Sequence, residues 1–332
     1  MSGGGTLGYR RASGVGAGAF TTLSVRPVGA PVPVLSTGPG PAELGRVALE
    51  AVRFGSVDAA GLERRAEELG GRVVTGSSLA AGLDLTIRCM DLVGPENLES
   101  ASSVAALASR AGEPDRSDPA CPAIAAVRVD PRFVAAVTDA LAGSSVRVVS
   151  GTARIAIGEH RPSQRLVEIG ETVTAGAHEV DIVFEGGQRY SDGIDRWYEA
   201  IVAATRACAP AKLNVGLELG GLDGYQEVRR ASMVAMAAGA DMIRIATGTR
   251  TPRASQAAVL CVSEAISDFA VQSGRRVGLK VDGNALGVEQ ALRYLVIVNE
   301  TLGIAWLRPD WFRLASTGLL DEVVEQRRTG RS

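Results

Sequence analysis

The chain has 332 residues, enough for one large domain or two ordinary ones, and 46% of them are apolar. Its 35 basic and 37 acidic residues give a net charge of −2, whereas a protein devoted to nucleic acid usually carries a basic surplus. Apolar runs such as 231–240 are about ten residues long, and a membrane-spanning helix needs roughly 20. We therefore expect no nucleic-acid partner and no membrane partner, and, because no secretion signal is visible, a cytoplasmic protein.

Residue types that bind metals or attack carbonyl groups are scarce. The two histidines and four cysteines include no C-x-x-C pair, so we expect no metal, no cofactor and no disulfide framework. All four cysteines are interpreted as small buried hydrophobic residues. Lysine occurs only at Lys212 and Lys280, which limits any mechanism that needs a lysine amine.

The N-terminal part differs in composition from the rest of the chain. Residues 1–45 are rich in Gly, Pro and Ser, a composition that buries too little surface to order a chain, so a disordered tail is predicted. Residues 46–84 form a helical lead-in, in which 61–71 (GLERRAEELGG) is typical of a short helix.

From residue 85 to 332, short β-branched runs alternate with Ala-rich segments of helical spacing. The predicted strands are 86–92, 123–129, 146–150, 179–184, 213–218, 242–246, 277–281 and 311–315, and the predicted helices are 98–110, 132–142, 163–175, 194–207, 225–238, 254–272, 288–301 and 319–327. Eight such units predict an α/β fold, a single-domain (β/α)8 TIM barrel. The alternative, an open doubly wound sheet, would want a G-x-G-x-x-G turn after the first strand, and none is present.

A barrel of this kind carries its chemistry at the carboxyl ends of the strands. Asp181 lies inside an otherwise apolar strand, where a lone carboxylate is costly unless it is paired or catalytic. Lys280 ends the run RRVGLK, where desolvation is expected to lower its pKa and make the amine nucleophilic. The structural alternatives are an ion pair of Asp181 with an interior Arg or Lys, and a salt bridge from Lys280 to Asp181 or Glu218.

Two arginines are predicted near the same ends. Arg244 closes DMIRIATGT, and a guanidinium there cannot form an imine but can grip a carboxylate or a phosphate. Arg128, in AAVRVDPRF, is a second candidate, with surface exposure as its alternative. Together with Lys280 they predict an electropositive mouth and a small, anionic substrate.

At these residues the chain resembles the deoxyribose-phosphate aldolase family, and its longer, animal-type members most closely. The resemblance runs from about residue 57 to 331 and rests on RRASMVAMAAGADMIRIATGT, RRVGLKVDG and LGIAWLRPDWFRLASTGLL, with support from EVDIVF. It implies a (β/α)8 barrel that makes or breaks a C–C bond between an aldehyde donor and a phosphorylated aldehyde acceptor. The family uses a lysine imine and no metal for this reaction. The resemblance also implies a homodimer.

Carried over residue by residue, the resemblance implies an altered site. The imine lysine of the K-T-S-T-G motif corresponds to Arg244, followed by Thr247 and Gly248, and a second family lysine corresponds to Lys280. The proton-relaying aspartate corresponds to Asp181. The aspartate of a D-L-T motif corresponds to Asp91 by spacing, although Asp84 fits the letters better.

Other family positions also change. A cysteine corresponds to Arg128, a tyrosine to Asp130, a lysine to Asn214, and an asparagine or proline to Glu185. The family's phosphate-binding turns change as well. A lysine is replaced by Thr249, a pair of glycines by Gly283-Asn284, and a G-A-S-S/T turn by Ala315-Ser316-Thr317-Gly318.

Three hypotheses follow for a repurposed site. The first is acid–base chemistry without an imine, in which Arg244 and Arg128 hold the substrate and Asp181, Glu185 or Lys280 moves a proton, with Asp91 beside them. It would fit C–C cleavage, dehydration, isomerisation or cyclisation, with specialised metabolism as a natural context. The second moves the imine to Lys280, its pKa lowered by Arg244. The third is a metabolite-binding protein without turnover.

Overall fold

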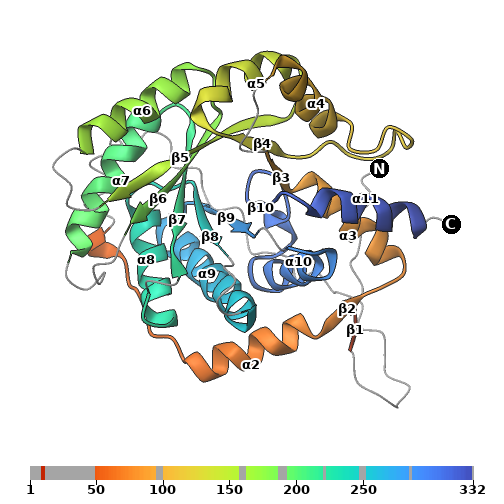
Figure 1. The fold of residues 1–332 in the computed structure, drawn as a ribbon. Helices are drawn as coiled ribbons and strands as arrows, with labels where there is room; N and C mark the ends of the chain where they lie inside the picture. Colours follow the sequence, from red (N-terminus) through yellow and green to blue (C-terminus); the bar gives the residue numbers. More distant parts are fainter. Residues whose placement is uncertain are drawn as a thin grey trace.

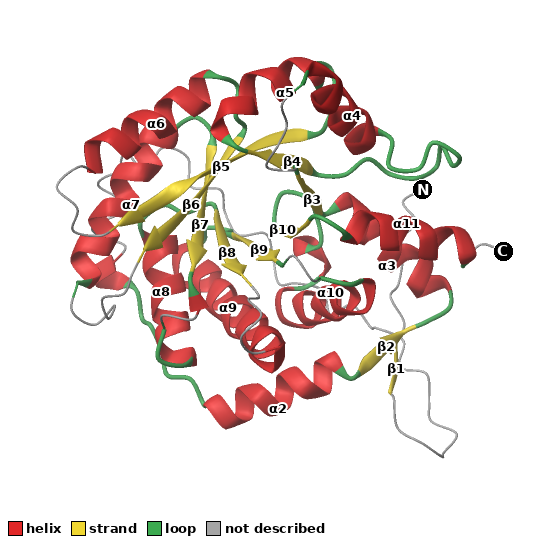
Figure 2. Cartoon of the chain, in the orientation of Figure 1, coloured by secondary structure: helices red, strands yellow, loops and turns green. Residues whose placement is uncertain are grey.

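Eight short, largely apolar segments form parallel strands that close into a barrel, with helices around them (Figure 1; Figure 2). The structure is a computed structural model, which describes residues 9–11, 49–94, 100–156, 162–185, 193–219, 222–246, 252–283 and 286–330. The strands follow one another in the order β10-β3-β4-β5-β6-β7-β8-β9, and β9 pairs with β10 to complete the circle. The predicted TIM barrel is therefore confirmed, and the open sheet is wrong.

The barrel strands are β3 (Met90–Val93), β4 (Ala126–Val129), β5 (Arg147–Ala156), β6 (Glu179–Glu185), β7 (Lys212–Leu217), β8 (Met242–Ala246), β9 (Gly278–Asp282) and β10 (Phe312–Ser316). Alternate residues such as Val127, Val215 and Ile243 are fully buried. They pack against the helices because successive side chains of a strand point to opposite faces.

Each strand is followed by a helix, as the alternating pattern predicts. These helices are α4 (Ala101–Gly112), α5 (Val134–Ala140) after the short turn η1 (Pro131–Phe133), α6 (Pro162–Thr174), α7 (Ile194–Cys208), α8 (Tyr225–Ala237), α9 (Pro252–Ser273), α10 (Val288–Leu302) after β9, and α11 (Leu319–Thr329) after β10. A further short turn, η4 (Ile304–Trp306), precedes β10.

The lead-in contains α2 (Ala59–Gly70), β2 (Arg72–Val74) and α3 (Ser77–Arg88). Helix α2, orange in Figure 1, packs against α9 and α10. Of the predicted tail, β1 (Tyr9–Arg11) is described and pairs antiparallel with β2. The remainder of 1–45 lies outside the described residues, so disorder there stays a prediction.

The first predicted strand, 86–92, begins too early. Thr86 and Ile87 belong to α3, where the Thr86 hydroxyl donates to the Gly82 carbonyl oxygen at 2.8 Å and Ile87 is fully buried. Local burial of the helix face outweighs the β preference of these two residues. The cysteine interpretation also needs one correction, because Cys121 is only half-buried, while Cys89, Cys208 and Cys261 are buried.

Candidate active site

The barrel interior is lined by charged side chains instead of the branched apolar residues that usually fill a TIM barrel. Strand register places Arg244 beside Lys280, and Lys280 beside Arg313, so these three side chains share the inner face. Contacts between strands that are not neighbours, such as β6 with β9, must cross this interior. The candidate site is built from those contacts.

Lys280 lies at the centre of the interior with its side chain fully buried. Its Nζ is 2.7 Å from Asp91 Oδ2 on β3 and 2.8 Å from Asp181 Oδ1 on β6. Burial lowers the pKa of Lys280, but the carboxylates of Asp181, Asp91 and Glu179 outweigh burial and raise it. The expected lowering of this pKa is therefore wrong, and the ion-pair alternative with Asp181 is confirmed.

Asp181 is held as a carboxylate by the cations around it. Burial raises its pKa, but Lys280, Arg128 and Arg244 outweigh burial and hold the pKa well below its usual range. Its Oδ2 lies 3.5 Å from Arg128 Nε and 3.8 Å from Arg244 Nε. Asp181 therefore stands between the buried ammonium and the two guanidiniums.

Arg128 and Arg244 form the outer layer of the site together with Asp282, the last residue of β9. Asp282 Oδ2 accepts from Arg128 Nη1 at 2.7 Å, from Arg244 Nε at 2.9 Å and from Arg244 Nη2. The side chains of Arg128, Arg244 and Asp282 are 22%, 11% and 11% exposed. This arginine–aspartate layer is the more accessible part of the site, and Lys280 has no exposed surface.

A deeper layer holds the carboxylates in place. Arg313 on β10 donates to Asp91 Oδ1 and to Glu179 Oε1, the latter at 2.7 Å. The Asn214 amide donates to Glu179 Oε2 at 3.0 Å and to Asp181 Oδ1 at 2.8 Å. Burial raises the pKa of Glu179, but Arg313, Lys280 and Asn214 bring it below its ordinary value.

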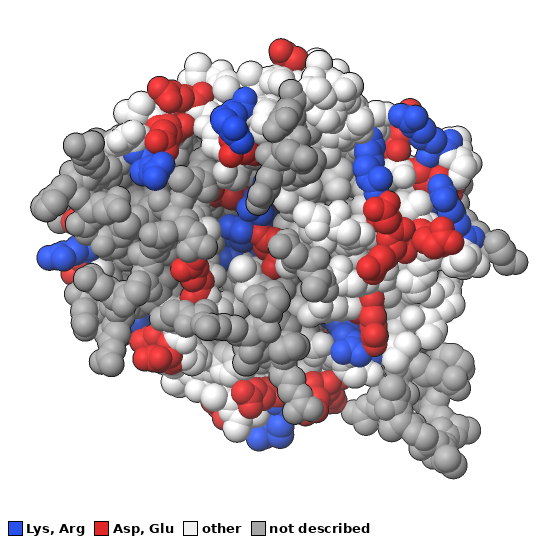
Figure 3. All heavy atoms as spheres, viewed as in Figure 1, with Lys and Arg blue, Asp and Glu red and all other residues white. Residues whose placement is uncertain are grey.

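Among the side chains that the structure describes, the predicted electropositive mouth is not found. The interior charges described above are four positive and four negative: Arg128, Arg244, Lys280 and Arg313 against Asp91, Glu179, Asp181 and Asp282. Basic and acidic atoms accordingly lie side by side near the middle of the face shown in Figure 3. Positive charge converges as predicted, but carboxylates from other strands neutralise it.

The structure brings together Asp91, Arg128, Asp181, Arg244 and Lys280 from the predicted set. Asp84 is not among them: it lies on α3 and accepts from Arg327 Nε at 2.6 Å, so Asp91 is the first-strand aspartate of the site.

The remaining predicted residues lie outside this cluster. Thr247 and Gly248 lie outside the described residues, as does the side chain of Glu185, while Gly283 directly follows β9. Ser316 is buried and its hydroxyl accepts from the Leu319 N–H at 3.4 Å, next to the exposed Thr317.

Asp282, Glu179 and Arg313 are site residues that the sequence reasoning missed. A signal for two of them was present, because Asp282 is two residues after Lys280 and Glu179 two before Asp181, and residues i and i+2 of a strand share a face. Their partners could not be read from the sequence, since every contact comes from another strand.

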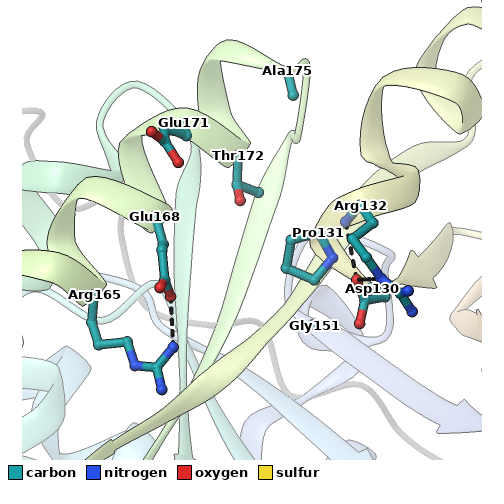
Figure 4. A pocket seen from close by; sticks show the side chains of 9 residues that line it. All are labelled: Asp130, Pro131, Arg132, Gly151, Arg165, Glu168, Glu171, Thr172 and Ala175. Carbon is teal, nitrogen blue, oxygen red and sulfur yellow. Dashed lines mark hydrogen bonds and ion pairs between the residues drawn. The ribbon is translucent and has the colours of Figure 1, made fainter.

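A cavity of about 650 Å³ opens between α6 and η1 (Figure 4). Gly151 lines it, and four of the charged residues on its walls are paired locally: Arg165 Nη1 with Glu168 Oε2 at 2.8 Å, and Arg132 Nε with Asp130 Oδ1 at 3.0 Å. Arg128, Arg244 and Asp282 are not among the residues that line this cavity.

Two features are absent from the described residues. No helix among them is long and apolar enough to cross a membrane. No three His, Cys, Asp or Glu side chains in that part of the chain are grouped so that they could hold a metal ion.

Comparison with known proteins identifies the family. No protein-family model matches the chain. The deoxyribose-phosphate aldolase of Mus musculus is 32% identical over 285 residues, which cover 81% of this chain and 88% of the mouse protein. That of Homo sapiens is 32% identical over 275 residues, covering 79% and 86%. The chain belongs to the deoxyribose-phosphate aldolase family. By this kinship it is an aldolase-like enzyme, and aldolases are carbon–carbon lyases.

Solved structures agree on the fold. A Toxoplasma gondii protein, provisionally described as a deoxyribose-phosphate aldolase, superposes with a TM-score of 0.64 at 21% identity, covering 76% of this chain and 96% of that one. The deoxyribose phosphate aldolase of Aeropyrum pernix gives 0.54 at 17% identity, covering 82% and 99%. Both show the same barrel fold.

Proposed function

We propose that the chain makes or breaks a carbon–carbon bond in a small carbonyl or sugar-like metabolite by acid–base catalysis, without a lysine imine. The observation that carries this proposal is the position of Lys280, fully buried between Asp91 and Asp181 and behind the arginine–aspartate layer. An imine needs a neutral amine that a carbonyl carbon can reach. Lys280 has a raised pKa and no exposed surface.

The other lysine gives no better nucleophile for this site. Lys212 is the first residue of β7, at the opposite end of the barrel, and its Nζ lies 3.8 Å from Asp310. Catalytic groups of a TIM barrel belong at the carboxyl ends of its strands. Arg244 stays protonated and cannot replace either amine.

The arginines supply a different kind of catalysis. In the cleavage direction a base takes the proton of the β-hydroxyl group, the C–C bond breaks, and its electron pair ends on the carbonyl oxygen as an enolate. N–H groups of Arg128 and Arg244 would neutralise that oxygen, a role worth about 10²–10³ in kcat for one donor in other enzymes. A proton returned to the enolate carbon completes the reaction.

Asp181 is the group that would carry the proton. It lies between the arginines and the Lys280 ammonium, to which it is hydrogen-bonded at 2.8 Å. As charge builds up on the substrate, the two groups can exchange a proton, while Asp91 keeps the ammonium in place. Ordinary cleavage of deoxyribose 5-phosphate, the substrate named by the relatives, is expected to be very slow or absent.

The test is exchange of carbon-bound hydrogen in D₂O, followed by proton NMR with acetaldehyde, glycolaldehyde, dihydroxyacetone and pyruvate. Wild type is expected to exchange the α-hydrogens of at least one probe, and Arg244→Gln to slow this by about 10²-fold or more. Arg293→Gln is the matched control, because Arg293 pairs with Glu289 on the exposed side of α10.

Two outcomes would contradict the proposal. Exchange unchanged in Arg244→Gln would remove the arginines from catalysis. Tight binding of a probe with no exchange of any of them would make the chain a metabolite-binding protein.

A further inference from the structure

The outer layer of the site already holds a carboxylate. One oxygen of Asp282 accepts three charge-assisted hydrogen bonds, one from Arg128 and two from Arg244. Guanidinium and carboxylate are complementary in charge and shape, and such bonds are roughly twice as strong as neutral ones. The pair of arginines is therefore a formed carboxylate-binding site with an internal occupant.

The strands next to the two arginines carry glycine at the positions that face the guanidiniums. A Cβ at Gly151 would lie 3.1 Å from Arg128 Nε, and one at Gly216 would lie 3.3 Å from Arg244 Nη1. A Cβ at either position would require the neighbouring guanidinium to give by a few tenths of an ångström. Two independent strands thus contribute to the same two-arginine clamp.

We propose that the Arg128–Arg244 clamp is the binding site for a carboxylate group of the substrate, and that this group replaces Asp282 when the substrate binds. The inference rests on the proposed function, since it assumes that the clamp faces the reacting carbonyl compound. It names the substrate class as carbonyl compounds with a carboxylate, of which 2-oxo acids are the smallest.

The exposures of Asp282 and Asp181 are compatible with an exchange of Asp282 for a substrate carboxylate. Asp282 ends its strand and keeps 11% of its side chain exposed, so it lies at the border of solvent. Asp181 below it is 1% exposed and contacts Lys280, so it is not the carboxylate that can leave. An incoming carboxylate restores the charge balance that Asp282 provides at rest.

The surroundings favour a carboxylate over a phosphate. The ionised Asp181 has its Oδ2 within 3.5 Å of Arg128 Nε and 3.8 Å of Arg244 Nε, on the same guanidiniums. A phosphate bound to the same guanidiniums would carry up to two negative charges, and the carboxylate of Asp181 would repel them. A carboxylate carries a single negative charge, so Asp181 repels it less. It is also the same chemical group as the Asp282 side chain that the clamp holds already.

A competition between Asp282 and the ligand gives the experiment. Asp282→Asn keeps the shape of the side chain and removes the charge that competes. We would titrate full-length wild type and Asp282→Asn by calorimetry with pyruvate, with pyruvamide as its uncharged counterpart, and with inorganic phosphate. Pyruvate is expected to bind Asp282→Asn at least tenfold more tightly than wild type, with no such gain for pyruvamide.

Three results would overturn the inference: no gain for pyruvate, an equal gain for pyruvamide, or a larger gain for phosphate than for pyruvate. If Asp282→Asn does not fold, wild type decides, because pyruvate must then bind at least tenfold more tightly than pyruvamide, and Arg128→Gln must abolish the difference. These are binding measurements, so they can fail while exchange at carbon succeeds with other probes, or succeed when no exchange occurs.

Discussion

Three carboxylates from two other strands hold Lys280 as an ammonium. Asp91 comes from β3, Asp181 and Glu179 from β6, and their combined charge outweighs the burial that would lower the pKa of the amine. Removing one partner of a buried ion pair leaves an uncompensated charge behind, which costs about 3–5 kcal/mol.

Lys280→Met should therefore lower the free energy of unfolding by about 3–5 kcal/mol, measured by urea denaturation. The control is Lys212→Met. The Lys212 side chain is 35% exposed and its Nζ lies 3.8 Å from Asp310, so this change should alter the free energy of unfolding by less than about 1 kcal/mol. Equal effects of the two variants would contradict the buried network.

The same network predicts how stability depends on pH. The pKa of Asp181 is lowered by folding, so its contribution is present above its unfolded value of about 3.9 and is lost as pH falls through the folded value. The pKa of Lys280 is raised, so its contribution is present below about 10.4 and is lost as pH rises through the folded value.

The melting temperature should consequently be nearly constant between about pH 5 and 9 and fall outside that window. Circular dichroism across a buffer series measures it. A steep decrease between pH 5 and 7 would mean that Asp181 takes up its proton far too early for the geometry described.

The sequence could place Asp181, Lys280, Arg128 and Arg244 on strands of one barrel, because each is a charged residue in an apolar run. It could not give the direction of the Lys280 pKa shift, which depends on partners about 100 and 190 residues away along the chain. Nor could it show that Asp282 neutralises both arginines.

At the scale of strands and helices, the absence of a side chain at Gly216 lets β7 and β8 carry Arg244 into the interior. A Cβ there would lie 2.8 Å from Val183 Cγ2 and 3.3 Å from Arg244 Nη1, both closer than ordinary contact. Since β6 and β8 flank Gly216 on the two sides, the valine must shift and the guanidinium must give by a few tenths of an ångström.

Gly216→Ala should lower the rate of carbon–hydrogen exchange by about tenfold or more while the protein stays folded, since a small displacement of a charged donor costs much of its effect. Gly112→Ala is the matched control, because nothing lies within 4 Å of its added methyl group. An unchanged rate in Gly216→Ala would show that Arg244 needs no such clearance.

Most element positions follow from the sequence, because short apolar runs alternate regularly with amphipathic helices, although β5 (Arg147–Ala156) extends beyond the predicted strand 146–150. The exception at α3 and β3 shows why boundaries are harder. Thr86 and Ile87 are β-branched, but they complete the last turn of a helix whose buried face also contains Leu83. Only the packing of that helix in the folded chain decides the matter.

At the scale of the whole molecule, α11 joins the end of the barrel to its beginning. Arg327 donates to Asp84 on α3 at 2.6 Å, to Asp118 and to the Ala120 carbonyl oxygen at 3.1 Å. Its side chain is 3% exposed, so these bonds are shielded from water. One residue thus contacts two segments, α3 and the 113–122 segment, that lie more than 200 positions away from it along the chain.

Arg327→Ala should lower the free energy of unfolding by about 2–4 kcal/mol, because two carboxylates and a carbonyl group lose the hydrogen bonds that Arg327 donates. The rate of carbon–hydrogen exchange per folded molecule should stay unchanged, since α3 and the 113–122 segment contribute no side chain to the described site. A change in exchange rate without loss of stability would contradict this separation.

Reduction with sodium borohydride decides whether this aldolase relative works without a lysine imine. The protein would be treated in the presence of saturating carbonyl substrate, digested, and the peptides containing Lys280 and Lys212 weighed by mass spectrometry, the latter as a measure of random surface modification. Without an imine, the Lys280 peptide keeps its mass under conditions in which substrate turns over. A substrate-derived mass gain on that peptide, above the level found at Lys212, would contradict catalysis without an imine.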